Sequence, residues 1–390
     1  MPWKETDVVN QRTEFILRVF EGKLSFGELC REYGISRKTG YKWKERFVEQ
    51  GLDGLGDRSR RPRNSPNQVD EDTACRIIRL KLAHPGWGPR KIHTVFGRTY
   101  PEVELASEST FKRVLDKAGL VKRRRRRKQG ESGRITNRIK AERPNQVWTV
   151  DFKGWWHTTD GSRFEPLTMR DAFSRYLLAA RALDNARSET VRLEFERVFD
   201  RYGLPEVIRS DNGIPFAASN APLGLSRLSA WWLALGIDLD RISPGRPDQN
   251  GGHERMHRDI ALEVESQSAD DIRAQQATLD TWRETFNHER PHEAIDMRVP
   301  ADLYRPSERR FHADEITLEY PMGYLRRRVS LRGVIRVRGL QVNVSSALSG
   351  WDVALQPTES HHRMGLWFCR LRLGEVDLET RKFHVAGGAG

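Results

Sequence analysis

With 390 residues, the chain is too long for one ordinary domain, and we expect three or four. Residues 1–147 carry 34 basic and 19 acidic side chains and the rest carries 33 and 35, so the N-terminal part is expected to bind nucleic acid. The three cysteines form no close pair, and no apolar run of about 18 residues or charged leader occurs, which argues against a zinc knuckle, membrane insertion and secretion and favours a reducing cytoplasm.

Residues 1–55 are predicted to form a helix-turn-helix domain. Apolar residues at helical spacing predict a helix over 8–20, a capping box at Ser25 opens a short helix that ends at Gly34, and Ser36 caps a third helix over Arg37–Gln50. Gly40 is a weak point in this helix, because glycine costs about 1 kcal/mol there relative to alanine. A three-helix bundle with a solvated charged face is the alternative. The residues expected to face the major groove or its phosphates are Ser36, Arg37, Lys38, Tyr41 and Lys42.

A polar linker over 56–66 leads to a second predicted helix-turn-helix domain, 67–121. Its helices are expected at about 71–83, from about 87, and after a cap at Ser107. Its candidate DNA contacts are Arg90, Ser109, Lys112 and Arg113.

A basic linker follows over 122–143. Its first seven residues repel one another and cannot pack, so they are expected to lie along or within a DNA groove, with an ordinary solvated linker as the alternative. These residues are Lys122, Arg123, Arg124, Arg125, Arg126, Arg127 and Lys128.

Residues 144–306 are predicted to form an α/β core. Strands are expected at about 146–153, 164–171, 175–182, 206–210 and 237–242, and helices at about 188–202, 225–235, from 250 and over 268–287. Three strands followed by alternating helices and strands predict a mixed sheet covered on both faces.

Residues 315–385 are predicted to form a small β-barrel, because short β-forming runs recur at 329–331, 334–337, 340–344, 351–355 and 366–373. Six arginines give this region a basic face, for which DNA contact and simple solvation are equal alternatives. They are Arg326, Arg327, Arg328, Arg332, Arg336 and Arg338.

Three acidic residues stand at the ends of different core elements. Asp151 closes one predicted strand, Asp211 follows another, and Glu254 lies in a Pro- and Gly-rich turn that opens a helix. Carboxylates brought together repel one another unless a hard divalent cation lies among them. Two Mg²⁺ ions about 3.5–4 Å apart clamp the attacking and leaving oxygens of a displacement at phosphorus, which indicates phosphoryl transfer on a polyanion.

Four motifs carry a family resemblance. They are Trp148-Thr149-Val150-Asp151-Phe152, Asp171-Ala172-Phe173-Ser174-Arg175, Ser210-Asp211-Asn212-Gly213 with Phe216, and Asn250-Gly251-Gly252-His253-Glu254-Arg255. In this order they resemble the DDE recombinases, the retroviral-type integrases and insertion-sequence transposases with a ribonuclease-H-like core. The resemblance extends through 287–292 and covers about 146–304.

Two features depart from the family pattern. The 43 positions from Asp211 to Glu254 exceed the family's usual spacing, and we expect the surplus to lie in a surface loop at 217–226. The zinc-binding His and Cys pairs of retroviral integrases are missing, since His84 and His93 have no cysteine pair, which favours the bacterial transposase branch.

Other acidic residues compete for places in the triad. In the family Asp171 belongs to a turn, so we expect its side chain to cap that turn. The remaining rivals are Asp238, Asp240, Asp248, Glu263 and Glu265. Asn212, Asn250 and Arg258 are candidate supporting residues. Arg258 shares a helix face with Glu254 and is expected either to hold a phosphate or to pair with the glutamate.

The resemblance implies a transposase that binds the terminal inverted repeats of its element, cuts its 3′ ends and joins them to target DNA. It implies two Mg²⁺ ions, for which Mn²⁺ substitutes, and a homodimer or higher homo-oligomer on double-stranded DNA. The expected location is the bacterial cytoplasm, on chromosomal DNA and without membrane contact. A metal-dependent nuclease that does not join DNA, and a DNA-binding regulator with a relic core, are the alternatives.

Overall fold

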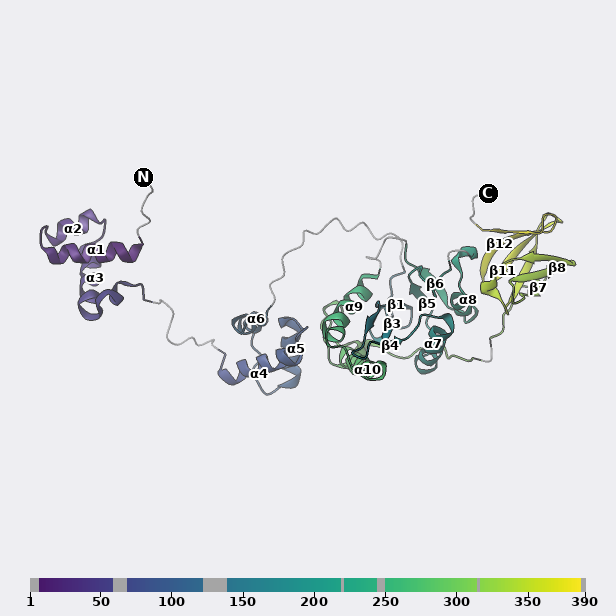
Figure 1. The fold of residues 1–390 in the computed structure, drawn as a ribbon, viewed down its shortest axis with the longest axis horizontal. Coiled ribbons are helices and arrows are strands. Elements are labelled where there is room, and N and C mark those ends of the chain that lie inside the picture. The colour runs from purple at the N-terminus through teal and green to yellow at the C-terminus, as the bar shows by residue number, and fades with distance from the viewer. Residues whose placement is uncertain are drawn as a thin grey trace. The chain divides into compact units, whose positions relative to one another are not determined.

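A computed structural model gives the structure of the chain and describes residues 7–58, 69–121, 139–218, 221–243, 250–313 and 316–386. The chain forms two compact units, Met1–Gln68 and Val69–Gly390. Figure 1 shows the elements in chain order, from the helices of the first unit to the C-terminal strands of the second. Within the ranges described, no helix is long and apolar enough to cross a bilayer.

The first unit contains the three predicted helices, α1 (Val8–Glu21), α2 (Phe26–Glu32) and α3 (Arg37–Gln50). The predicted caps are present, because Ser25 and Glu28 form a capping box and the Ser36 side chain accepts from the backbone N–H of Thr39. The helices enclose one apolar core, whose fully buried members are Phe15, Ile16, Leu29, Cys30, Trp43 and Leu55.

Gly40 lies where α3 packs most closely against its neighbours. A Cβ atom at this position would lie 2.8 Å from Cys30 Sγ, 3.0 Å from Phe26 Cζ and 3.1 Å from Phe15 Cζ. The glycine that looks like a weak point in the sequence therefore allows the close approach of the three helices.

The second unit begins with three more helices, α4 (Glu71–Ala83), α5 (Pro89–Thr99) and α6 (Glu108–Lys117), as predicted. Pro89 is the first residue of α5, where its missing N–H costs nothing, and Ser107 caps α6. A separate apolar core holds them together, with Ile77, Trp87, Ile92, Phe96, Phe111 and Leu115 fully buried.

The central sheet of the second unit is mixed, as predicted. Its strands are β1 (Val147–Phe152), β2 (Trp156–His157), β3 (Arg163–Asp171), β4 (Leu177–Leu183), β5 (Val207–Ser210) and β6 (Asp238–Arg241). The order is β2-β3-β1-β5-β6, and β4 also pairs with β3. Pairing is antiparallel among β1 to β4 and parallel for β1 with β5 and β5 with β6. The two-residue strand β2 was not predicted.

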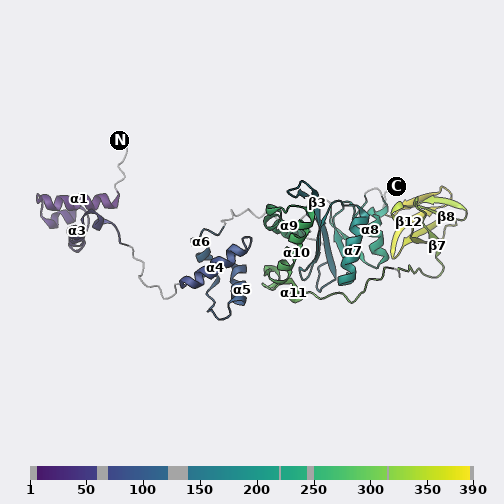
Figure 2. The same cartoon turned by 60° about the horizontal axis from the view of Figure 1, so that its bottom comes forward.

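Helices cover both faces of this sheet (Figure 2). On one face α7 (Ser188–Tyr202) and α8 (Arg227–Ala234) pack against Trp148 and Val150 of β1. On the other face α9 (Gly251–Glu263) and α10 (Ile272–His288) pack against Phe164 and Leu177, and α11 (Pro300–Leu303) follows. Because side chains alternate along a strand, Thr149 and Asp151 lie on the α9 side of β1.

The C-terminal region contains β7 (Leu325–Arg328), β8 (Val334–Val337), β9 (Leu340–Asn343), β10 (Asp352–Pro357), β11 (Arg363–Phe368), β12 (Leu371–Asp377) and β13 (Lys382–Val385). They form a five-stranded antiparallel sheet, β13-β12-β11-β10-β7, and a separate β8-β9 hairpin. A closed, fully hydrogen-bonded barrel is therefore not confirmed in the described residues, although the predicted all-β character is.

Two strand predictions in this region were wrong, and two strands, β7 and β13, were missed. The single strand expected over 366–373 is two strands joined by a turn at Cys369, whose φ is +51°. The strand expected at 329–331 is the connection after β7, and β13 was not predicted.

The expected surface loop at 217–226 is only partly exposed, because Ala217 and Leu225 form a β-bridge and are both buried.

Candidate functional site

Asp151 and Asp211 lie side by side at one edge of the central sheet. The parallel pairing of β1 with β5 places Thr149 opposite Arg209. Two residues further along each strand direction, this register brings Asp151, near the end of β1, beside Asp211, which directly follows β5. The carboxyl ends of neighbouring parallel strands are the usual place for a site in such a sheet.

Glu254 reaches the same edge from the first turn of α9. The residue before it, His253, is fully buried and fixes the helix to the sheet: its Nδ1 lies 2.8 Å from Thr149 Oγ1 and its Nε2 lies 2.8 Å from Thr168 Oγ1. His257, one turn further, places its Nε2 2.8 Å from the same Thr168 hydroxyl. The sheet therefore sets the position of the helix that carries Glu254.

The donors and acceptors of this contact follow from the proton count. Thr168 has one hydroxyl proton, and Oγ1 donates it to the backbone oxygen of Asp151 at 3.0 Å. Both histidines then donate Nε2–H to Thr168. Burial lowers the pKa of His257 to about 3 and that of His253 well below its usual value, which keeps both rings neutral. A neutral His253 accepts at Nδ1 from the Thr149 hydroxyl, which also lies 3.3 Å from the Arg170 backbone oxygen.

The electrostatics of Asp151 show that the charges of the other two carboxylates act on it. Burial, and then the negative charges of Asp211 and Glu254, raise the pKa of Asp151 to about 7. Asn250, the N-cap residue of α9, donates its Nδ2–H to Asp151 Oδ2 at 3.4 Å. As the side chains stand, no group of three or more Asp, Glu, His or Cys side chains in the described ranges is packed tightly enough to hold a metal ion.

Of the predicted supporting residues, Asn250 contacts the acidic group directly, whereas Asn212 holds the loop behind it. Asn212 donates its side-chain N–H to the backbone oxygen of Ile242 at 2.5 Å, which joins the loop after β5 to the end of β6. Arg258 pairs with Glu254 at 3.6 Å and is largely exposed. Gly213 donates its backbone N–H to Asp211 Oδ1 at 3.0 Å.

The rival carboxylates that the structure describes are engaged elsewhere. Asp171 caps its turn as expected, since it accepts from the N–H and hydroxyl of Ser174 at 2.7 and 2.6 Å. Asp240 pairs with Arg209, Asp238 with Arg370, Glu263 with Arg290 and Glu265 with Lys153. Asp248 lies outside the described residues.

The predicted DNA contacts of the helical domains are all exposed. In α3 and its cap these are Ser36, Arg37, Lys38, Tyr41 and Lys42, and in the second domain Arg90, Ser109, Lys112 and Arg113. Ser36 and Arg90 also have internal partners, the Thr39 N–H and Glu108. The predicted basic run over 122–128 lies outside the described residues. Of the C-terminal arginines, Arg327 is half-buried and the other five are exposed.

Sequence reasoning missed the residues that lock α9 and α10 to the core. Arg290 is 3% exposed and binds two carboxylates of α9, Asp259 at 2.7 Å and Glu263 at 3.0 Å. Asn287 donates to the Leu177 backbone oxygen at 2.9 Å and accepts from its N–H at 2.8 Å. Both belong to the motif over 287–292, which was noted only for its resemblance. Its polar residues next to a proline at the end of an amphipathic helix were the available signal.

Comparison with known proteins agrees with this arrangement. The sequence matches a helix-turn-helix domain over residues 11–63, a homeodomain-like domain over 39–115, integrase core domains over 141–247 and 235–300, and the C-terminal domain of the IS481 family transposases over 326–384.

Similar sequences come from bacterial insertion elements and from retroviruses. An uncharacterized 31.7 kDa protein of insertion element IS407 from Burkholderia multivorans is 27% identical over 61% of this chain and 82% of its own length. A 39.2 kDa protein of IS476 from Xanthomonas euvesicatoria is 28% identical over 61% of this chain and 66% of its own length. The Gag-Pol polyprotein of baboon endogenous virus is 32% identical over 32% of the chain and 7% of the polyprotein.

Among solved structures, the catalytic core domain of HTLV-2 integrase in complex with magnesium matches all of its own length and 43% of this chain, with 13% identity and a TM-score of 0.32. A simian T-cell lymphotropic virus intasome matches over 77% of this chain and 100% of the compared chain, with 14% identity and a TM-score of 0.37. These scores are too low to add to the assignment.

The integrase core matches, on a chain whose core has this mixed sheet, indicate a polynucleotidyl transferase of the DDE type. The chain is a transposase of the integrase superfamily, with DNA-binding helix-turn-helix domains before its core and relatives in bacterial insertion elements.

Proposed function

We propose that this transposase cuts the 3′ ends of its own element and joins them to target DNA, with Asp151, Asp211 and Glu254 as catalytic residues. The observation that carries the proposal is the place of Asp151 and Asp211 at the carboxyl ends of two paired parallel strands, where the charges of Asp211 and Glu254 help to raise the pKa of Asp151 to about 7. Carboxyl groups whose pKa is raised by their surroundings are often found at catalytic sites.

The donor set fits a hard divalent cation, because all three residues offer carboxylate oxygens. Asp151 and Asp211 would hold one ion, and Glu254 would hold a second. Mg²⁺ would supply a Lewis acid that stabilises negative charge on the phosphate under attack, and Mn²⁺ would substitute for it.

The chain's own residues fix the site in advance. Asn250 orients the carboxylate of Asp151, the Gly213 N–H orients Asp211, and Arg258 neutralises part of the charge of Glu254. His253 and Thr168 hold α9 against the strand that carries Asp151. Such rigid support lowers the reorganisation needed when charge develops on the substrate.

The helix-turn-helix domains would bind the terminal inverted repeats, with the exposed residues of α3 and α6 in the grooves. Because two DNA ends must be cut and joined together, we propose a homodimer or higher homo-oligomer on double-stranded DNA. The place of action would be the chromosome in the bacterial cytoplasm.

The test uses the full chain, labelled terminal DNA and Mg²⁺, with Asp151→Asn, Asp211→Asn and Glu254→Gln. Each change should leave DNA binding intact and reduce both cleavage and joining by about 10²–10³-fold or more, as expected for loss of a main electrostatic element. Asp200→Asn, at an exposed position of α7, is the matched control and should behave as wild type.

The products decide between this function and its alternatives. Joined strands support the proposal, cleavage without joining supports a nuclease, and binding alone supports a regulator with a relic core. Joining by Asp151→Asn would show that the catalytic assignment is wrong.

A further inference from the structure

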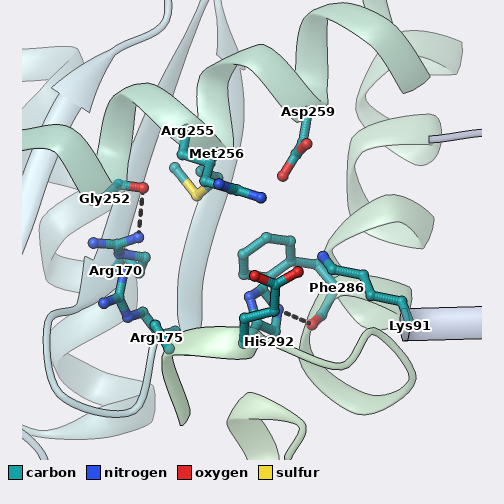
Figure 3. Close-up of a pocket in the computed structure, with 11 residues that line it drawn as sticks. Lys91, Arg170, Arg175, Gly252, Arg255, Met256, Asp259, Phe286 and His292 are labelled. Carbon is teal, nitrogen blue, oxygen red and sulfur yellow. Dashed lines mark hydrogen bonds between the residues drawn. The ribbon is translucent and has the colours of Figure 1, made fainter. Parts of the chain in front are cut away.

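A polar cavity lies beside α9, and none of the three carboxylates of the candidate site lines it. It has a volume of about 340 Å³ and is lined by α5, β3, the turn after β3, α9, α10 and the segment that follows α10. Four of its lining residues are cations: Lys91, Arg170, Arg175 and Arg255. Figure 3 shows Arg170 and Arg175 on one side, Lys91 on the other, and Arg255 reaching in from α9.

No ion pair in the described ranges neutralises the four cations of this cavity, although the charge of Asp171 acts on Arg170 and the charges of Asp259 and Glu263 act on Lys91. Its two carboxylates are Asp259, which pairs with Arg290 at 2.7 Å, and Glu293. Within the described ranges, neither of them nor any other acidic residue forms an ion pair with one of the four cations. Arg170 donates from Nη1 to the Gly252 backbone oxygen at 2.7 Å, and its buried Nε has no hydrogen-bond partner in the same ranges.

Two of the four cations are also removed from water. Arg170 is 5% exposed and Lys91 is 8% exposed. Burial, followed by the nearby charge of Arg290, lowers the pKa of Lys91 to about 8; burial and the charge of Arg175 lower the pKa of Arg170 to about 9. Buried cations without a counterion are costly, so a cluster of them is a site prepared for an anion.

The cluster touches the start of the helix that carries Glu254. A Cβ atom at Gly252 would lie 2.4 Å from Arg170 Nη2 and 3.0 Å from Arg175 Nη1, so both guanidinium groups converge on this residue. Gly252 lies two positions before Glu254, and Arg255 directly follows it. An anion held here would bridge β3, the turn at Arg175 and the first turn of α9.

We propose that this cavity binds a backbone phosphate of the element's DNA, through Arg170, Arg175, Arg255 and Lys91, so that bound DNA fixes the first turn of α9. The proposal rests on the DNA-joining function given above. Guanidinium groups suit a phosphate because they offer paired N–H donors. The cavity has the size of a small-ligand site, which admits a phosphate with part of its sugar and excludes a duplex.

The main variants are Arg255→Gln and Lys91→Gln in the full chain, with Arg273→Gln as the matched control. Arg273 is exposed on α10 and lies outside the cavity. The affinity for labelled terminal DNA is measured at several KCl concentrations. Each cavity variant should weaken binding roughly tenfold and reduce the log–log salt slope by about 1, whereas the control should keep the wild-type slope. An unchanged melting temperature shows that the variants are folded.

A second measurement locates the phosphate. Duplexes that carry one neutral methylphosphonate each are bound to wild type and to Arg255→Gln. At one position, or at two adjacent positions, the methylphosphonate should weaken DNA binding by wild type roughly tenfold. The same substitution should not weaken binding by Arg255→Gln any further. Additive losses at every position, together with wild-type salt slopes in both cavity variants, would overturn the proposal.

A third measurement separates DNA phosphate from a free anion, with sodium pyrophosphate in thermal unfolding without DNA. Stabilisation of wild type but not of Arg255→Gln, combined with no Arg255-dependent methylphosphonate position, would assign the cavity to a free phosphate anion and overturn the DNA assignment. Failure of the proposed function is a different result, in which wild type itself does not join terminal DNA.

Discussion

Arg290, two residues beyond the end of α10, and Asp259 of α9 form an ion pair with an N–O distance of 2.7 Å in which the guanidinium is almost fully buried. The same guanidinium binds Glu263, one helical turn later, at 3.0 Å. One arginine therefore fastens the helix that carries Glu254 to the helix behind it, with His253 fastening its other side to the sheet.

Replacing Arg290 by alanine should lower the free energy of unfolding of the second unit by roughly 3 kcal/mol, because two carboxylates lose a buried partner. Arg290→Lys should fall between alanine and wild type, since a lysine cannot bridge two carboxylates as a guanidinium fork does. Urea unfolding followed by tryptophan fluorescence measures both, with the exposed Arg273→Gln as control. A midpoint for Arg290→Ala equal to that of wild type would show that this clamp contributes nothing.

Stability should depend on His257 at acid pH. Its pKa is about 3 in the folded chain, below the ordinary 6.5, so below pH 6.5 the unfolded state binds a proton that the folded state does not. The neutral ring makes its full contribution to the free energy of unfolding above pH 6.5. This contribution is lost as the pH falls, by up to about 2 kcal/mol at pH 5. Asp151, whose pKa is raised to about 7, acts in the opposite direction.

The measurement is therefore a comparison of urea unfolding for wild type and His257→Gln at pH 7 and pH 5. The variant should lose less stability than wild type between these two values. If both proteins lose the same amount, His257 is not held neutral as the structure indicates.

Adding Mg²⁺ should raise the melting temperature of wild type, because an ion that binds only the folded chain stabilises it, by about 2.7 kcal/mol at 100 times Kd. The gain should be larger at pH 8 than at pH 6, since the Asp151 carboxyl, with its pKa of about 7, must lose its proton to bind the ion. EDTA should reverse the effect. Asp151→Asn should show little gain at either pH, and an equal gain in this variant would place the ion elsewhere.

Gly40→Ala should destabilise the first unit, although alanine favours a helix by about 1 kcal/mol. The added methyl group meets Cys30, Phe26 and Phe15 at 2.8–3.1 Å, and overpacking of this kind typically costs about 1–3 kcal/mol. Limited proteolysis of the full chain should cut this unit sooner than in wild type. Gly56→Ala, whose added methyl group would meet only the Asp53 backbone oxygen at an ordinary 3.5 Å, should have almost no effect. Greater protease resistance of Gly40→Ala would contradict the packing argument.

Local signals explain what the sequence could predict. Helix caps depend on residues three positions apart, so the starts of α2, α3 and α6 follow from Ser25, Ser36 and Ser107. The two aspartates at the carboxyl ends of neighbouring strands follow from the strand pattern. Bringing them together requires only the parallel pairing that an α/β alternation implies.

The missed features depend on distant parts of the chain or on weak local signals. Arg170 and Arg290 look like surface arginines in the sequence, and only packing reveals them as buried. The turn at Cys369 has no glycine to mark its left-handed residue, so two strands looked like one. The arginines of β7 gave no apolar pattern, because this strand joins the sheet at its edge.

The apolar side chains of Leu225, Ala230 and Leu233, at and just before α8, share one cluster with Val353, Leu366 and other residues of the C-terminal sheet. Arg370 adds an ion pair to Asp238 at 2.9 Å across the same boundary. A truncation after residue 306 is an obvious choice for crystallising the core alone, but it would expose this apolar surface to water. Such a fragment should precipitate or self-associate, so expression work is better served by retaining the chain through residue 386.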